Sequence, residues 1–311
     1  MSQSTSEIDS SNPLGCFTIQ KKLSKSRFSV YQALDTKYNR QVALKVFPKS
    51  SCTLHNFQKE QYFFNKLNHP NILRMFEAVE SSQSTIEEEN GTVSYISLEY
   101  AKHGDLFGII SKSGYMSEPL ARTLFAQLVE GVSYIHSRKV AHLDLKIANL
   151  LIDEEFKLKI TDFDLAHAFS EDSTPSISSR GSCGYRAPEI KDGSCRNPIA
   201  ADIYSLGIIL FVLKSKGAIP HTETTPYKGI HLFDLLYQNN DEFWSHHVKI
   251  GNFKDDYFED EFKALFNSLT KFTPSERLSV DKIKNTNWYN GPVYNNEEYT
   301  KVMADLMSAN I

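Results

Sequence analysis

The chain has 311 residues, which at a prior of about 150 residues per domain indicates two compact units or one large one. A formal net charge of −4 argues against a generally nucleic-acid-binding surface. Hydrophobic residues make up 41% and charged residues 23%, an ordinary globular composition that excludes a disordered scaffold for most of the length.

Cysteine spacing and hydropathy argue against further classes of protein, namely zinc-binding, disulfide-rich, secreted and membrane-spanning ones. The four cysteines form no C-x-x-C pair, so reduced thiols are favoured over a zinc site or a disulfide framework. Residues 1–12 are polar and serine-rich, without the apolar core of a signal peptide. The longest uncharged apolar run, residues 206–213, is far short of the ~20 residues that a membrane helix needs. We therefore expect a soluble protein of the cytoplasm, with the nucleus as the alternative, that is not secreted and has neither membrane nor nucleic acid as a partner.

The first third of the chain has the pattern of a β-rich unit. Residues 1–15 are expected to form a disordered tail, and residues 30–34, 42–47 and 93–99 are rich in the β-branched and apolar residues typical of strands. Between them, apolar residues at helical spacing over 57–67 predict a helix that Pro70 ends. The polar, acidic stretch 80–91 is predicted to be a solvated loop between two strands.

Beyond about residue 102 the pattern changes to helices. Apolar residues recur at helical intervals over 117–136, with a proline where that helix would start. Residues 202–213 and 259–269 predict further helices, the first of them buried all round. The sequence thus predicts a mostly-β part of roughly 85 residues followed by a mostly-α part of roughly 190.

The clearest chemical signal is the run His142-Leu-Asp144-Leu-Lys146-Ile-Ala-Asn149, with Asp162-Phe163-Asp164 following 18 residues after Asp144. Such a loop can bring an acid, a cation and an amide to one point, and a second carboxylate nearby suits a divalent cation, which prefers oxygen ligands. Upstream, Lys45 ends an apolar strand and needs a partner, for which Glu60 on the predicted helix is the candidate.

These residues, in this order, resemble the catalytic domain of eukaryotic protein kinases. The resemblance rests on seven pieces, from about residue 17 to residue 288. The pieces are Val42-Ala43-Leu44-Lys45, Glu60 nine residues before His69-Pro70-Asn71-Ile72, the run His142–Asn149, Asp162-Phe163, Ala187-Pro188-Glu189, the run from Asp202 to Gly207, and Arg277. The run Asp144-Leu145-Lys146 is similar to the serine/threonine type, and Cys183-Gly184-Tyr185-Arg186 loosely resembles the calcium/calmodulin-dependent group.

The resemblance implies an α+β, bilobal protein-kinase-like fold, with a small β-rich N-lobe containing one main helix and a larger, mostly α-helical C-lobe. The implied boundaries are a disordered tail over 1–15, a kinase domain over 16–289 and a C-terminal extension over 290–311. Within the domain the N-lobe would span 16–101 and the C-lobe 102–289, with the nucleotide held in the cleft between them.

The family also implies a role for each matching residue. Lys45 would hold the α- and β-phosphates of ATP while Glu60 orients it, Asp144 would orient and deprotonate the substrate hydroxyl, and Lys146 would offset charge on the transferred phosphoryl group. Asn149 and Asp162 would bind Mg²⁺. The residues expected to contact the nucleotide are Leu23, Ser24, Ser26, Ser29, Val30, Ala43, Lys45, Leu98, Glu99, Ala101, Asp105, Leu151 and Asp162.

Other motif residues are expected to be structural. His142 should be a packed, hydrogen-bonded histidine beside Phe163 and Phe64, and Asp202 should brace the backbone of the catalytic loop. Glu189 and Arg277 should form a buried ion pair, because an unpaired buried charge would be costly.

The sequence departs from the family pattern in three ways, the first of them in the phosphate-binding loop. Ser24, Ser26 and Ser29 stand at the spacings of the three glycines of the phosphate-binding loop, and a serine forced into the left-handed region costs roughly 1 kcal/mol. A serine hydroxyl can still donate to a phosphate, and Lys25 and Arg27 can offset some of the loss, so weakened rather than abolished nucleotide binding is expected.

The second departure is Asp164, which replaces the glycine that normally ends the metal-binding triplet; it either repels the phosphates or points to solvent. The third is Leu143, in place of the arginine that normally pairs with a phosphorylated loop residue. Phosphorylation is therefore not expected to be the main activating switch, although the loop holds acceptors at Ser170, Ser173, Thr174, Ser176, Ser178 and Ser179.

The sequence therefore favours an ATP- and Mg²⁺-dependent kinase that phosphorylates serine or threonine hydroxyls of protein substrates. The alternative is a pseudokinase that binds partners with little or no turnover, favoured by the three serines and Asp164. A small-molecule phosphotransferase is a more distant third. Neither the substrate nor the regulator can be read from the sequence.

Overall fold

A computed structural model describes residues 13–25, 28–113, 116–170, 177, 180–221, 226–227 and 230–308. The chain folds into two compact units. The first unit comprises the chain up to Asn68 together with Leu73–Lys102, and the second comprises His69–Ile72 and His103–Ile311. Residues 1–12 of the predicted tail lie outside the described residues.

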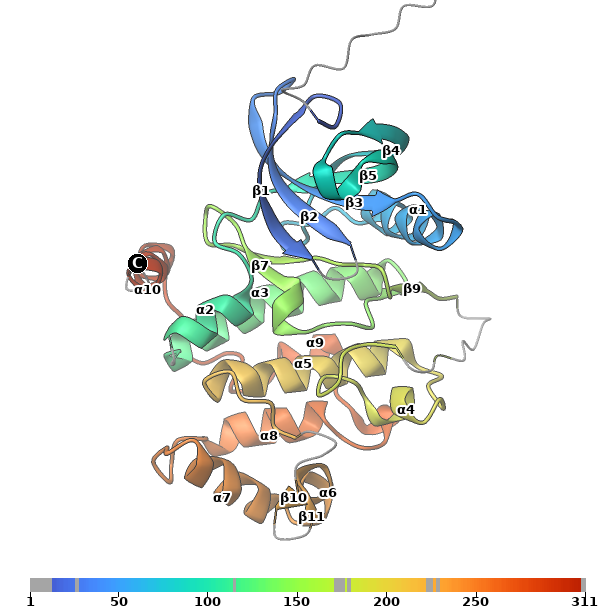
Figure 1. Ribbon diagram of the computed structural model, residues 1–311. Helices are drawn as coiled ribbons and strands as arrows, with labels where there is room; N and C mark the ends of the chain where they lie inside the picture. The colour runs from blue at the N-terminus through green and yellow to red at the C-terminus, as the bar shows by residue number, and fades with distance from the viewer. Residues whose placement is uncertain are drawn as a thin grey trace, which may run out of the picture. The chain divides into compact units, whose positions relative to one another are not determined.

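The first unit is a five-stranded antiparallel sheet with one long helix beside it (Figure 1). The spatial order of its strands is β1-β2-β3-β5-β4. The elements are β1 (Phe17–Lys25), β2 (Ser29–Asp35), β3 (Arg40–Pro48), α1 (Ser51–Lys66), β4 (Met75–Ser84), the 3₁₀ turn η1 (Glu87–Glu89) and β5 (Gly91–Glu99).

The two faces of this sheet separate core from candidate site. Alternate side chains of a strand point to opposite faces, so Val42, Leu44 and Val46 of β3 enter the buried core while Ala43 and Lys45 point to the other face. Each strand predicted from β-rich composition is confirmed, one or two residues longer at one or both ends. The predicted helix is also confirmed, but it begins at Ser51 because Ser50 caps it through a capping box with Thr53.

Two predictions for the first unit are wrong. The stretch 80–91 is not simply a loop, because β4 continues through it to Ser84, which pairs with Gly91 of β5. The ladder of backbone hydrogen bonds outweighs the polarity of these side chains. The end of the tail predicted over 1–15 is also wrong, because Leu14 is fully buried in the sheet core and forms a bridge with Ser84.

The second unit is mostly helical, with α5 lying between α3 and α8 (Figure 1). Short two-stranded ribbons pair β6 with β9, β7 with β8 and β10 with β11. The helices are α2 (Leu106–Ser113), α3 (Glu118–Ser137), α4 (Pro188–Lys191), α5 (Pro198–Lys214), α6 (Leu232–Gln238), α7 (Asn240–Ile250), α8 (Asp260–Leu269), α9 (Val280–Ile283) and α10 (Asn296–Ser308). The other elements are β6 (Val140–Ala141), β7 (Leu150–Ile152), β8 (Leu158–Ile160), β9 (His167–Ala168), β10 (Pro226–Tyr227), β11 (Ile230–His231), η2 (Ile147–Asn149) and η3 (Pro274–Glu276).

The three helices predicted beyond residue 102 are confirmed as α3, α5 and α8. Helix α5 is buried on all sides, as predicted, with Ile199 as its one partly exposed residue. It begins where the side chain of Asn197 accepts a hydrogen bond from the amide of Ala200 and Pro198 takes the first helical position. Within the described part of the chain, no helix combines the length and hydropathy needed to cross a membrane.

Candidate active site

The first unit gathers one group of the predicted residues on the non-core face of its sheet. Val30 pairs with Lys45 across β2 and β3, and Ala43 pairs with Leu98 across β3 and β5. Residues directly opposite each other on neighbouring strands share a face. Val30, Ala43, Lys45 and Leu98 therefore line one surface, around a single cationic side chain.

Lys45 and Glu60 form a buried ion pair. The Nζ atom of Lys45 lies 2.8 Å from Oε1 and 2.7 Å from Oε2 of Glu60, and the two residues are 8% and 1% exposed. The rings of Phe28 and Phe47 each have their centroid 5.7 Å from the same Nζ. The pair is thus a desolvated one with a fixed direction, and not the surface pair that it would be outside this context.

The loop that carries the serines is short. Lys25 of β1 pairs with Ser29 of β2, so only residues 26–28 connect the strands. Ser26 lies outside the described residues. Leu23 is 39% exposed, and Ser24 is exposed opposite Val30.

The hydroxyl of Ser29 is bonded within the protein, contrary to the expectation that it would be offered to a phosphate group. Its hydroxyl donates to Oε1 of Glu89 at 2.6 Å, and the residue is only 4% exposed. In the same 3₁₀ turn, Glu88 forms an ion pair with Lys22 of β1. The acidic segment that was predicted to be a solvated loop therefore holds both strands near this loop.

Four predicted nucleotide contacts lie at the ends of strands and helices. In the first unit, Ala101 is buried, and the carboxylate of Glu99 accepts a hydrogen bond from the amide of Arg74 at 3.1 Å. In the second unit, Leu151 of β7 forms a bridge with Asp105. The carboxylate of Asp105 accepts from the amide of Gly108 at 2.7 Å, which caps the first turn of α2.

The second unit brings the catalytic-loop residues together. Oδ2 of Asp144 accepts from Nζ of Lys146 at 2.7 Å and from Nδ2 of Asn149 at 3.2 Å. The same amide nitrogen donates to the backbone carbonyl of Asp144 at 2.9 Å. Intervals of two and three residues do converge an acid, a cation and an amide here, because the loop tightens into η2 at its end.

Ser182 completes this cluster and was not predicted. Its hydroxyl donates to Oδ1 of Asp144 at 2.8 Å and accepts from Nζ of Lys146 at 2.7 Å. The preceding residue, Gly181, has φ +86°, and a Cβ there would lie 2.7 Å from the carbonyl oxygen of Leu143. The close approach of these two loops is the reason that glycine precedes the serine, and it is the sequence signal that could have pointed to Ser182.

Asp202 braces the catalytic loop, as expected. Fully buried, its carboxylate accepts hydrogen bonds from the amides of His142 and Leu143, both at 2.8 Å, and lies 2.9 Å from Nε2 of His136. Leu143 has φ +64°, a conformation that is costly for a residue with a side chain. Two charge-assisted hydrogen bonds hold this strained turn immediately before Asp144.

His142 has a structural role. Its Nδ1 accepts from the amide of Asp144 at 3.2 Å, so Nε2 carries the hydrogen and donates to the carbonyl of Thr161 at 2.9 Å. Its ring lies 5.0 Å from that of Phe163. Since both ring nitrogens are engaged, this histidine is not placed to act as a general base.

Asn149 and Asp162 offer the donor set of a magnesium site. The amide of Thr161 donates to the carbonyl of Asn149 at 3.1 Å, which ties together the residues beside the two candidate ligands. Because Nδ2 of Asn149 donates to Asp144, the side-chain oxygen remains to coordinate a cation, and Asp162 adds a carboxylate. The described residues hold no cluster of three or more His, Cys, Asp or Glu side chains suited to a metal, so phosphate and water oxygens would complete the shell.

The other departures from the family pattern lie close to this loop. Asp164 is partly buried, and Leu143 is 7% exposed. Of the six possible phosphorylation positions, Ser170 is described and exposed, while residues 173, 174, 176, 178 and 179 lie outside the described residues.

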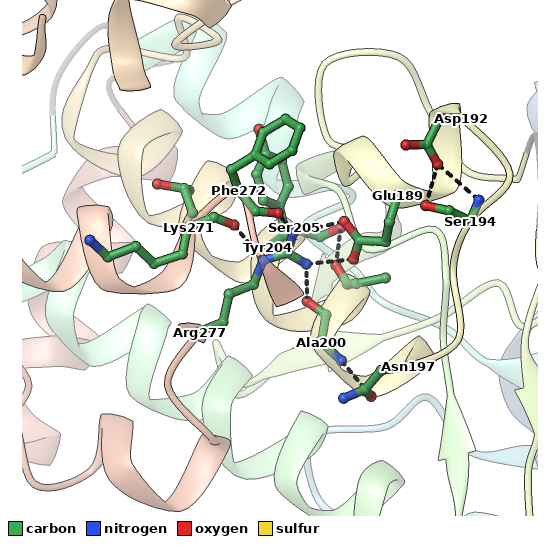
Figure 2. Close-up of polar contacts among 12 residues, drawn as sticks. Glu189, Asp192, Ser194, Asn197, Ala200, Tyr204, Ser205, Lys271, Phe272 and Arg277 are labelled. Atoms are coloured by element: carbon green, nitrogen blue, oxygen red, sulfur yellow. Dashed lines mark hydrogen bonds and ion pairs between the residues drawn. The ribbon is translucent and has the colours of Figure 1, made fainter. Parts of the chain in front are cut away.

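A buried ion pair holds the helical unit together, as predicted (Figure 2). Nη1 and Nη2 of Arg277 lie 2.6 and 2.7 Å from the two carboxylate oxygens of Glu189. The remaining donors of the guanidinium bind the carbonyls of Lys271, Ala200 and Phe272. A buried charge pair is tolerated when its other hydrogen bonds are satisfied, which is the case here.

The two units thus show the folds of a β-rich N-lobe and a helical C-lobe. The first contains the Lys45–Glu60 ion pair, and the second contains the cluster around Asp144. Sequence comparison agrees: the protein kinase domain matches residues 17–289. The chain therefore belongs to the protein kinase family.

The curated relatives are protein kinases, several of them named as serine/threonine-protein kinases. The chain is 34% identical over 291 residues to CBL-interacting protein kinase 11 of Oryza sativa subsp. japonica, a match covering 90% of this chain and 52% of the relative. It is 36% identical over 281 residues to CBL-interacting protein kinase 26 of the same organism, covering 88% and 52%. With serine/threonine-protein kinase SIK2 of Gallus gallus the identity is 29% over 280 residues, covering 88% and 32%. The chain spans about half the length, or less, of these relatives.

Proposed function

We propose that this chain is an active protein kinase that transfers the γ-phosphoryl group of ATP to serine or threonine hydroxyls of protein substrates. The observation that carries the proposal is the convergence of Asp144, Lys146, Ser182 and Asn149 within hydrogen-bonding distance. A chain that had lost catalysis would be under no requirement to keep an acid, a cation and an amide at one point.

Each residue of the site has a role that follows from its chemistry. Asp144 orients the acceptor hydroxyl and takes its proton, while the adjacent Lys146 offsets negative charge on the phosphoryl group in transit. Lys45, directed by Glu60, binds the α- and β-phosphates. Asn149 and Asp162 would hold Mg²⁺, which when bound neutralises charge on the phosphates. Serine or threonine as acceptor is supported by those relatives that are named serine/threonine-protein kinases.

The pseudokinase remains the second candidate because of Ser29 and Asp164. Because the hydroxyl of Ser29 donates to Glu89, the loop has one fewer hydrogen-bond donor for a phosphate group. Asp164 adds a carboxylate beside Phe163. Both features weaken nucleotide binding without removing a residue that acts on the phosphoryl group.

The deciding experiment compares the natural chain with Asp144→Asn in phosphoryl transfer from labelled Mg-ATP to a mixed serine/threonine peptide library. We expect transfer by the natural chain and a loss of at least about 100-fold in the variant, because the general base is removed. Asp260→Asn, a change at a fully exposed carboxylate, is the matched control and should transfer normally. Transfer by folded natural chain that does not exceed that of Asp144→Asn would favour the pseudokinase.

The protein substrates, the cytoplasmic location and the lack of nucleic-acid and membrane partners stay predictions. So do the bounds of the kinase domain, 16–289, and the extension over 290–311.

A further inference from the structure

The turn between β7 and β8 is strained. Phe156 has φ +62°, a left-handed conformation that a residue with a side chain adopts at a cost. The carboxylate of Asp153 holds part of the turn by accepting from the amides of Glu155 and Lys157. A strained backbone persists where its surroundings determine it, so the contacts made to Phe156 itself are of interest.

Two contacts from outside the turn hold Phe156. Its ring stacks on that of His103, with centroids 4.6 Å apart and an interplanar angle of 22°. Its carbonyl oxygen accepts a hydrogen bond of 2.7 Å from the hydroxyl of Tyr299, which comes from α10. Burial raises the pKa of Tyr299 to about 12, so this hydroxyl remains a donor at neutral pH.

Helix α10 packs through one face against the rest of the second unit. Tyr299 and Met303, four residues apart and so on one face of the helix, are 8% and 0% exposed. The surface around Tyr299 is not uniformly filled, since a cavity of about 500 Å³ is lined there by residues of α3, the turn and the C-terminal segment, among them Gln127, Lys157 and Thr300. The tyrosine hydroxyl is therefore a specific link between α10 and the turn, beside an incompletely packed space.

The strands on either side of this turn lead directly to the two candidate metal ligands. β7 begins immediately after Asn149, and β8 ends two residues before Asp162. The amide of Thr161 donates to the carbonyl of Asn149, and the amide of Leu158 donates to the side chain of Gln127 at 2.8 Å. A shift of the turn would thus pass along two short paired strands to the side chains of Asn149 and Asp162.

We propose that α10, which lies beyond the part of the chain that matches the family, is a positioning element for the metal-binding pair Asn149 and Asp162, acting through Tyr299 on the turn at Phe156. This inference rests on the proposed function for the identity of the metal ligands. Tyr299 touches neither ligand, so it is a positioning residue and not a catalytic one.

The test measures Mn²⁺ binding in the presence of ADP by electron paramagnetic resonance, for the natural chain, Tyr299→Phe and Tyr294→Phe. Tyr299→Phe removes only the hydroxyl, and we expect about 3- to 10-fold weaker Mn²⁺ binding. This is less than the roughly 10- to 100-fold cost of losing a direct outer-shell partner, because Tyr299 contacts neither ligand. Tyr294 lies in the same C-terminal segment, but its hydroxyl bonds Ser117, 2.9 Å away, so Tyr294→Phe is the matched control and should bind normally.

A second readout separates positioning from general destabilisation. Amide hydrogen exchange of residues 150–162 should be faster in Tyr299→Phe than in Tyr294→Phe, at equal overall stability in urea. Mn²⁺ binding by Tyr299→Phe that equals the natural chain would overturn the inference, whatever the exchange shows, and so would a natural chain that binds no Mn²⁺ with ADP. Binding that weakens as expected in a chain that transfers no phosphate would support the inference while refuting the proposed function.

Discussion

At the scale of single residues, the carboxylate of Asp144 has defined partners for both oxygens. Oδ2 faces Lys146 and Asn149, whereas Oδ1 accepts from Ser182, whose hydroxyl also accepts from Lys146. Ser182 therefore fixes the rotation of the acid and the position of the cation at once. Pre-organised groups of this kind lower a barrier because they need not reorganise during the reaction.

Removing the Ser182 hydroxyl should slow the reaction. For Ser182→Ala we expect kcat to fall about 10- to 100-fold, since a hydrogen bond to a charged group contributes roughly 1.5–3 kcal/mol. Ser182→Thr keeps the hydroxyl and should stay within about threefold of the natural chain. Steady-state kinetics with a peptide substrate measure both, and Ser194→Ala, which affects only a bond to Asp192 on the surface, is the control. Natural kcat in Ser182→Ala would show that Lys146 and Asn149 position Asp144 without it.

Sequence spacing predicted the residues within one continuous loop better than those brought together by tertiary contacts. Asp144, Lys146 and Asn149 share a short loop, so their convergence follows from local geometry. Ser182 reaches them from a distant segment of the chain. The hydroxyl of Ser29 is bonded to Glu89, which lies in the connection between β4 and β5. Neither contact has a sequence interval that could reveal it, because loop lengths between paired segments are not fixed.

At the scale of elements, the close approach of α5 to the end of α8 depends on Gly207. A Cβ at this position would lie 2.6 Å from Cγ2 of Thr270 and 2.9 Å from Cβ of Leu269. Packing therefore requires glycine at position 207, although glycine has a low helix propensity.

Gly207→Ala should destabilise the protein despite its better helix propensity. Because two contacts would fall under 3.0 Å, we expect an overpacking cost in the upper part of the typical range, about 2–3 kcal/mol. Subtracting the gain in propensity of about 1 kcal/mol leaves a net loss of about 1–2 kcal/mol in the free energy of unfolding. Urea denaturation measures it. The control is Gly108→Ala in α2, where the added Cβ meets its nearest neighbour at 3.5 Å, an ordinary contact. A Gly207→Ala variant as stable as the natural chain would mean that α8 moves aside freely.

Elements with strong periodicity were predictable, and those held by their neighbours were not. The helices α3, α5 and α8 each carry their own run of apolar residues, and α5 is also capped by the side chain of Asn197. The end of β4 is polar and is a strand only because β5 pairs with it. Likewise, Leu14 is ordered by the sheet core that it enters, although its flanking sequence resembles a tail.

At the scale of the whole molecule, a group of buried histidines makes stability depend on pH. The Nε2 atom of His221 lies 2.8 Å from the hydroxyl of Tyr204, and Nε2 of His247 lies 2.8 Å from the carbonyl of Pro220. Burial lowers the pKa of each of these histidines to about 4, from an ordinary value of 6.5. In the unfolded chain both would titrate at the ordinary value.

The direction of the pH effect follows from these pKa values. Between pH 6.5 and 4 the unfolded chain binds protons at these histidines that the folded chain does not, so the free energy of unfolding falls as the pH falls. At full effect the slope is about 1.4 kcal/mol per pH unit for each histidine. Carboxylates, whose ordinary pKa values lie near 4, add to the effect below about pH 5.

Replacing one of these histidines should reduce the slope by up to about 1.4 kcal/mol per pH unit. His247→Asn removes the titrating ring and keeps an N–H donor for the carbonyl of Pro220, so the variant should lose less stability than the natural chain between pH 6.5 and 5. Urea denaturation at half-unit pH steps measures the slope, and His55→Asn, at an exposed position of α1, is the control. A slope that is the same in His247→Asn and in the natural chain would mean that His247 is protonated in the fold. Its burial against Phe211 and Phe243, whose ring centroids lie 4.7 and 4.6 Å from its own, argues against that charge.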